Sequence, residues 1–191
     1  MSFVKIDPNT QKTAFKYKFI LLYPMLRIIF DTNIYSFIAK DNNGKEIAIR
    51  IKNNKDLRIY GYRLIKDEIK EIPKGLKHDG QRLRTYLINL YFDLIKEQYP
   101  ELPRIKKLAE VYYTEFKKLG GKRSFHDLGV DFEIVACATI HNLDLVVSND
   151  NKTLRGAISL NAYKNVNLRN KLKTPNFYNL EDLKKVIGMS S

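Results

Sequence analysis

The chain has 191 residues, 44% of them hydrophobic, which is enough for one domain with a full core and excludes an intrinsically disordered chain. Its formal net charge of +13 favours a polyanionic partner, most often nucleic acid, although solvated lysine-rich faces would give the same excess. The single cysteine, Cys137, excludes an intramolecular disulfide framework and a zinc site with several cysteine ligands, and it fits a cytoplasmic protein.

Residues 1–24 are predicted to be an N-terminal extension, with two alternatives for its nature. Aromatic residues alternate with lysines at positions 15–19, which is typical of an added edge strand. Alternatively, Met25 is the natural start and the extension is not native. No membrane association is expected, because the apolar stretch that leads into the first strand is short and is interrupted by Pro24 and Arg27.

The remaining residues, 25–191, alternate between strand and helix patterns. Strands are predicted at 26–30, 56–60 and 143–147, with a short edge strand near Phe177. Helices are predicted after Asp31 and at 45–52, 63–72, 83–94, 105–119, 131–140 and 179–187. Residues 74–81 are expected to be loop, residues 151–176 to be less regular, and the two long helices to form a helical arm at about 80–120. This order predicts a single α/β domain whose parallel sheet is covered on both faces.

Four acidic residues stand at the edges of these elements. Asp31 and Asp150 follow the first and last long strands, Asp131 is expected to open its helix, and Glu68 lies on the helix after the second strand. Any one of them alone would usually be a turn or helix-cap residue. Ligands of such sheets bind outside the carboxyl ends of the strands, so the four carboxylates are expected to meet there. Converging carboxylates repel one another unless a cation holds them, which favours a hard divalent ion and metal-assisted phosphoryl chemistry.

The strings around these acids resemble the motifs of PIN-domain nucleases. Ile28–Asn33 is similar to the opening motif, an apolar strand followed by Asp, Thr or Ser, and Asn or Ser. Arg63–Ile69 looks like the second motif, Asp131–Ala138 like the third, and Val146–Asp150 like the fourth. The resemblance covers roughly residues 26–187, and the stretch before the last helix also looks like the ending of an archaeal, VapC-like PIN domain.

The resemblance implies a PIN-like three-layer α/β/α fold and Mg²⁺- or Mn²⁺-dependent hydrolysis of RNA phosphodiester bonds by water. It implies that Asp31, Glu68, Asp131 and Asp150 hold the metal, and that Asn33 and Ser148 hold metal-bound waters or orient a carboxylate. The expected partners are RNA, a small antitoxin protein and a second copy of the chain. The activity would be that of the toxin of a VapBC-type pair or of a housekeeping RNA-processing enzyme, and the non-catalytic alternative is a scaffold that binds RNA or protein.

Several assignments stay open at the level of sequence. Glu71 competes with Glu68 as the second acid, and Asp127 is either a further acid or a helix-start residue. A haloacid dehalogenase-type phosphatase would need an Asp at the position of Asn33 and is therefore disfavoured. Five basic residues lie near the acids in sequence and are predicted either to contact phosphate or to form a solvated face: Lys66, Lys70, Lys122, Arg123 and Arg155.

Overall fold

A computed structural model describes residues 25–189 of the chain, so the predictions for residues 1–24 lie outside the described residues. One five-stranded sheet forms the centre of the molecule, in the order β5-β2-β1-β6-β7, and every neighbouring pair is parallel. Its strands are β1 (Leu26–Phe30), β2 (Leu57–Tyr62), β5 (Ile95–Tyr99), β6 (Leu145–Val147) and β7 (Asn176–Tyr178). The predicted α/β class with a parallel sheet is confirmed.

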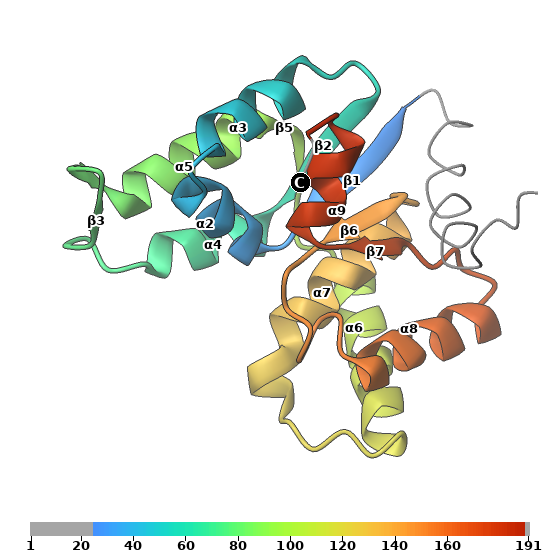
Figure 1. The fold of residues 1–191 in the computed structure, drawn as a ribbon. Helices are drawn as coiled ribbons and strands as arrows, with labels where there is room; N and C mark the ends of the chain where they lie inside the picture. Colours follow the sequence, from blue (N-terminus) through green and yellow to red (C-terminus); the bar gives the residue numbers. More distant parts are fainter. Residues whose placement is uncertain (1–24, 190–191) are drawn as a thin grey trace, which may run out of the picture.

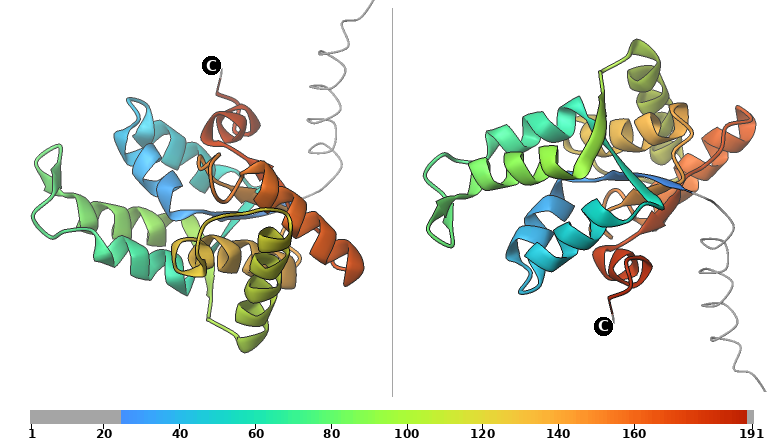
Figure 2. Two further views of the ribbon diagram at one scale, coloured as in Figure 1. Left: turned by 90° about the horizontal axis from the view of Figure 1, so that it is seen from below. Right: turned by 90° about the horizontal axis from the view of Figure 1, so that it is seen from above.

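Helices cover both faces of this sheet. They are α2 (Thr32–Lys40), α3 (Gly44–Asn53), α4 (Arg63–Glu71), α5 (Leu83–Leu94), α6 (Pro103–Lys118), α7 (Phe125–Ile140), α8 (Ala157–Arg169) and α9 (Leu180–Val186). Figure 2 shows α2, α3 and α9 on one face and α6 and α7 on the other, with α8 packed beside α6. Within residues 25–189, no helix combines the length and the apolar character that crossing a membrane would require.

The central strand β1 positions the first residue of the candidate site. Ile28, Ile29 and Phe30 are fully buried, as expected for an apolar strand with a helical layer on each side. β1 pairs with β6 so that Phe30 lies opposite Val147. The next residues, Asp31 and Ser148, therefore leave the same edge of the sheet side by side.

A helical arm is present, but it is built differently from the one predicted. It consists of α4 and α5, with the hairpin of β3 (Lys77–His78) and β4 (Gln81–Arg82) at its tip (Figure 1). The second predicted arm helix, α6, instead packs against α7 and α8. Strand β5 separates the two helices and extends the sheet beyond β2. It was not predicted because its central residues, Lys96 and Glu97, are charged and exposed.

One further helix begins earlier than predicted, and another was not predicted. Helix α7 begins at Phe125, six residues before Asp131, because Ser124 and Asp127 form a capping box at its N-terminus. The stretch after Asp150, expected to be less regular, contains the 13-residue helix α8. Its buried face includes Ser159 and Asn167, so it lacks the continuous apolar stripe that would have predicted it.

Candidate active site

Asp31 and Ser148 are joined at the carboxyl ends of β1 and β6. The backbone N–H of Asp31 donates to the carbonyl of Val147 at 2.9 Å, which continues the ladder one step past the strands. The Ser148 hydroxyl donates to Oδ2 of Asp31 at 2.6 Å. Asp31 is 6% exposed and Ser148 is fully buried. Burial raises the pKa of Asp31, and this outweighs the hydrogen bond from Ser148.

Asn33 ties the first turn of α2 to this pair. Its amide nitrogen donates to Oδ2 of Asp31 and lies 3.2 Å from the hydroxyl oxygen of Ser148. Its amide oxygen accepts from the backbone N–H of Asn149 at 3.1 Å. Both ends of the Asn33 side chain are therefore used to hold β1 and β6 in register beyond their last residues, which suits it to orienting the Asp31 carboxylate.

Glu68 reaches the site from α4. The hydroxyl of Thr32, the residue after Asp31, donates to Oε2 of Glu68. Partial burial raises the pKa of Glu68, and the charges of Asp31 and Glu71 raise it further. Glu71 lies one turn later on α4 and is exposed. The structure therefore brings Glu68 to Asp31 and leaves Glu71 at the surface.

Asp150 lies in the loop between β6 and α8, where its carboxylate closes a tight turn. Its Oδ1 accepts from the backbone N–H groups of Lys152 at 2.7 Å and Thr153 at 2.8 Å, and the Thr153 hydroxyl donates to Oδ2. Burial raises the pKa of Asp150, but these hydrogen bonds and the charge of Arg123 outweigh burial and bring the pKa below its usual value.

Asp131 projects from the second turn of α7 rather than from its start. Its half-buried carboxyl has a pKa raised to about 7, first by burial and then by the charges of Asp31, Asp150 and Glu68, against a hydrogen bond with Thr153. The four predicted acids thus act electrostatically on one another at one end of the sheet.

Asp127, the alternative acid of the third motif, has a different role. It occupies the third position of α7 and is exposed. The Ser124 hydroxyl donates to Oδ2 of Asp127 at 2.7 Å, and this interaction lowers the pKa of Asp127. The structure therefore places Asp127 in the helix cap, away from the four acids.

Three hydroxyl groups donate to three of the carboxylates: Thr32 to Glu68, Ser148 to Asp31 and Thr153 to Asp150. Thr153 also lowers the pKa of the fourth acid, Asp131. Sequence reasoning gave a role to Ser148 but missed the other two. Thr32 lies within the Ile28–Asn33 segment, but no role was predicted for it. Thr153 follows Asp150 by three residues, the spacing at which an Asp side chain commonly caps a turn, and this signal could have identified it.

The donor chemistry of the site fits a hard divalent cation. Its ligands would be carboxylate oxygens, which suit Mg²⁺ or Mn²⁺ and disfavour softer metals that prefer sulfur. Among residues 25–189, no three Asp, Glu, His or Cys side chains lie together closely enough to hold a metal ion as they stand. Side-chain rotation would therefore be needed to gather three of these oxygens around one ion.

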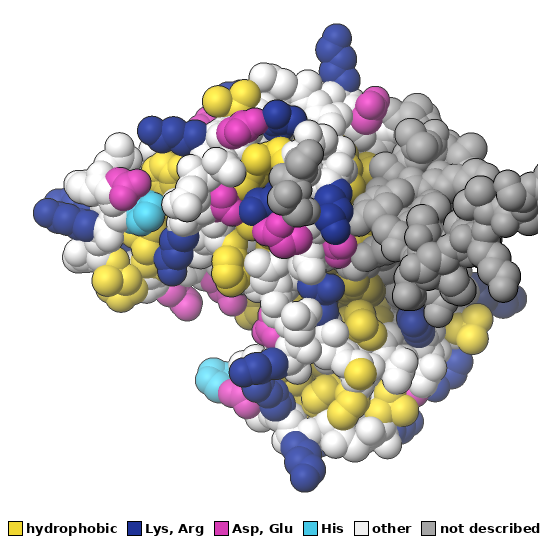
Figure 3. Space-filling model, viewed as in Figure 1, with side chains coloured by type: hydrophobic (Ala, Val, Ile, Leu, Met, Phe, Trp, Pro, Cys, Tyr) yellow, Lys and Arg dark blue, Asp and Glu magenta, His cyan; other side chains and the backbone are white. Residues whose placement is uncertain are grey.

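The surface around the acids is hollowed and basic at its edge. Figure 3 shows a hollow between the arm and the lower end of the molecule, with acidic side chains on its wall and basic side chains on its lower lip. Within the described residues, Lys66, Lys122 and Arg123 form no ion pair. Lys70, in contrast, pairs with Asp67 at 3.0 Å. Arg155 donates to the carbonyl of Ser148 at 2.9 Å, so it braces the loop below the acids rather than pointing freely to solvent.

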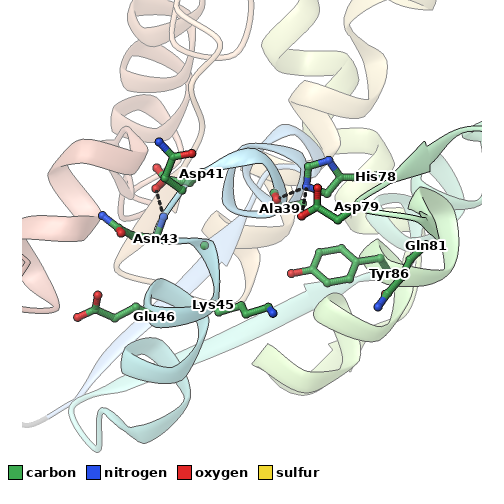
Figure 4. Close-up of a pocket in the computed structure, with 11 residues that line it drawn as sticks. Ala39, Asp41, Asn43, Lys45, Glu46, His78, Asp79, Gln81 and Tyr86 are labelled. Carbon is green, nitrogen blue, oxygen red and sulfur yellow. Dashed lines mark hydrogen bonds and ion pairs between the residues drawn. The ribbon is translucent and has the colours of Figure 1, made fainter.

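A separate groove of about 520 Å³ lies at the other end of α2. It opens between the α2–α3 turn and the β3–β4 hairpin, where His78 contacts the carbonyl of Ala39 at 2.7 Å (Figure 4). The nine residues of α2 separate it from Asp31 by roughly 13 Å along the helix axis. None of the four acids lines this groove, so its size does not make it the site of the chemistry.

Comparison with known proteins gives a single kind of match. No protein-family model matches the chain, and no curated protein matches it. Among solved structures, it is similar to a chain from the crystal structure of VapBC2 from Rickettsia felis bound to a DNA fragment from their promoter. The two share 11% sequence identity with a TM-score of 0.49, over 81% of this chain and 98% of that chain.

Proposed function

We propose that this protein is a metal-dependent endoribonuclease of the PIN type. The observation that carries the proposal is the meeting of four carboxylates, from the residue after β1, α4, α7 and the β6–α8 loop, at the carboxyl end of a parallel sheet. The pKa of Asp131 is raised to about 7, first by burial and then by the charges of the other three acids. A cluster of this kind is unfavourable for the bare protein, and a bound divalent cation would relieve the repulsion.

Asp31, Glu68, Asp131 and Asp150 are the residues that would hold Mg²⁺ or Mn²⁺. Such an ion supplies a water of lowered pKa and neutralises the phosphate. Asn33 and Ser148 fix the orientation of the Asp31 carboxylate, and Thr32 holds Glu68 toward it. Residues that hydrogen-bond to metal ligands in this way restrict the motion of the ligands and so preserve the arrangement that an ion needs.

The substrate is proposed to be RNA, and positively charged residues around the acids would guide it to the site. Lys122 and Arg123 are exposed in the connection before α7, and the charge of Arg123 reaches Asp150. Replacing both with Ala is expected to weaken binding of single-stranded RNA across sequences. The slope of log affinity against log salt should fall by about 0.7 for each lost phosphate contact. Lys55→Ala, at the opposite end of the sheet, is the matched control, and an equal effect there would refute this path for RNA.

Cleavage of a panel of structured and unstructured RNAs, with and without Mn²⁺, tests the activity. The wild-type protein is expected to cut only with the metal. Asp31→Asn is expected to remove cleavage while leaving the fold intact, because the amide keeps the side-chain shape but loses the charge. Asp56→Asn, an exposed Asp at the other end of the sheet, controls for the substitution. Metal-dependent cleavage by Asp31→Asn at the wild-type rate would end the proposal.

A non-catalytic scaffold that binds RNA or protein is the competing function, and one observation favours it. Asp31, Glu68 and Asp150 each already accept a hydrogen bond from a hydroxyl group, and among the described residues no three acids lie within reach of one ion. A scaffold would bind RNA equally well with and without Mn²⁺ and would leave all RNAs intact. It would also bind RNA at least as tightly after Asp31→Asn, since a negative charge is lost.

Within the nuclease proposal, a toxin of a VapBC-type pair is the finer assignment. It implies a small antitoxin partner and a homodimer. Expression of the wild-type protein, but not of Asp31→Asn, is then expected to arrest growth, and co-expression of the antitoxin should restore it. Normal growth together with active cleavage in vitro would favour a housekeeping RNA-processing role.

A further inference from the structure

Thr153 lies in the turn between β6 and α8, directly below the acids. The residue is 7% exposed, so its side chain is held by the surrounding protein. Its backbone N–H donates to Oδ1 of Asp150 at 2.8 Å, and its hydroxyl donates to Oδ2 of the same carboxylate. Thr153 therefore fixes both oxygens of Asp150, and with them the direction in which this carboxylate faces.

The same side chain also lies near enough to the carboxyl of Asp131 on α7 to lower the pKa of that carboxyl. A hydroxyl has one donor and two acceptor positions, so it can donate to the Asp150 carboxylate and accept from the Asp131 carboxyl when the latter is protonated. Thr153 thus stands between two acids that come from different elements. No strand pairing fixes their separation, because Asp131 lies in mid-helix and Asp150 lies in a loop.

The contacts of Thr32 and Ser148 differ in kind. Asp31 and Ser148 follow paired residues of adjacent strands, so the backbone ladder already sets their separation. Thr32 belongs to the first turn of α2 and donates to Glu68 on the neighbouring arm. Between α7 and the β6–α8 loop, Thr153 is the side chain that lies between the acids. Its β-branched carbon also restricts its rotamer.

We propose that Thr153 is a positioning residue that sets the separation of Asp131 and Asp150, so that the two carboxylates can bind one divalent cation. This inference rests on the proposed function and adds a residue to its machinery. Thr153 itself need not touch the metal or the RNA. Its hydroxyl would guide the two acids in the metal-free protein and give up one of them as the ion enters.

Binding of Mn²⁺ alone, measured by calorimetry and by the electron paramagnetic resonance signal of the bound ion, tests this role without RNA. Thr153→Val keeps the shape and removes the hydroxyl. It is expected to weaken Mn²⁺ binding by about 10- to 100-fold, the range found when a residue that orients metal ligands is lost. Thr153→Ser keeps the hydroxyl and is expected to retain wild-type affinity. Thr114→Val, on the outer face of α6, is the matched control.

Circular dichroism and thermal unfolding without metal show whether each variant is folded, and Thr153→Ala takes the place of Thr153→Val if the latter is not. Wild-type Mn²⁺ affinity in the folded variant that lacks the hydroxyl, beside lost affinity in Asp31→Asn, would overturn the role of Thr153 and leave the nuclease proposal standing. Absence of Mn²⁺ binding by the wild-type protein would instead overturn the proposed metal-dependent function, and the positioning role with it.

Discussion

Replacing Asp131 with Asn should stabilise the metal-free protein, and the effect should depend on pH. The pKa of Asp131 is raised from 3.8 to about 7 in the folded protein. Below pH 3.8 the carboxyl is protonated in both the folded and the unfolded chain and imposes no penalty. As the pH rises toward 7, the unfolded chain ionises while the folded one must keep its proton, so stability is lost.

The size of the effect follows from the same values. One pKa unit corresponds to about 1.4 kcal/mol, so a rise from 3.8 to about 7 gives at most about 4 kcal/mol at pH 8.5. The neighbouring acids share the repulsion, so we expect Asp131→Asn to raise the free energy of unfolding by about 2–4 kcal/mol at pH 8.5 and to leave it unchanged near pH 3. Chemical denaturation followed by circular dichroism, in the presence of a chelator, measures this difference.

Asp150→Asn provides a control of opposite sign. The pKa of Asp150 is lowered, so its ionised form stabilises the fold above the unfolded pKa, and this contribution is lost as the pH falls through the folded value. Asp150→Asn should therefore destabilise the protein at pH 8.5 and have its smallest effect in acid. Parallel stability curves for the wild type and Asp131→Asn across this range would refute the electrostatic account of the site. Added Mn²⁺ should stabilise the wild type more than Asp131→Asn.

Three substitutions test the packing that supports the site. Tyr112→Phe removes a buried hydroxyl that links α6 to α7 and α8, and it should lower the free energy of unfolding by about 1–3 kcal/mol, whereas Tyr113→Phe, whose hydroxyl contact is exposed, should change it little. Gly61→Ala would place a methyl group 2.8 Å from the Tyr91 ring and should destabilise β2 by about 1–3 kcal/mol in urea unfolding. Ser124→Ala should lower the thermal unfolding temperature through a loss of about 1 kcal/mol at the start of α7, and an unchanged temperature would contradict the capping box.

The part of the site built on β1 and β6 was predictable because its signals are local. An apolar run that stops at an acidic residue marks the end of a buried strand, and Asp31 follows this pattern. The side-by-side arrangement of Asp31 and Ser148 then follows from parallel pairing. The sequence favoured Glu68 but left Glu71 as its rival, because the two lie one turn apart on α4. In the structure, Glu68 accepts a hydrogen bond from Thr32 and is partly buried, whereas Glu71 is exposed.

Other elements were missed because long-range contacts stabilise them. Helix α8 buries Asn167, whose amide accepts from the Tyr112 hydroxyl at 2.6 Å and donates to Thr174 at 3.1 Å. A polar residue with partners on other elements looks like a surface residue in sequence, so the buried face of α8 could not be recognised from its hydrophobic pattern. Strand β5 gains its regular structure from pairing with β2, although its own middle residues are charged and exposed. Such elements follow from the fold, not from local propensity.

The dispersal of the four acids along the chain has a consequence for protein synthesis. Asp31, Glu68 and Asp131 all precede β6 in the sequence, and Asp150 follows β6, which pairs with β1 in the sheet. A chain that grows from its N-terminus can form α2 to α5 and the β1–β2–β5 half of the sheet well before that. The acids cannot all meet until synthesis has passed Asp150. An unfinished polypeptide still attached to the ribosome, and so surrounded by RNA, would therefore lack the assembled site.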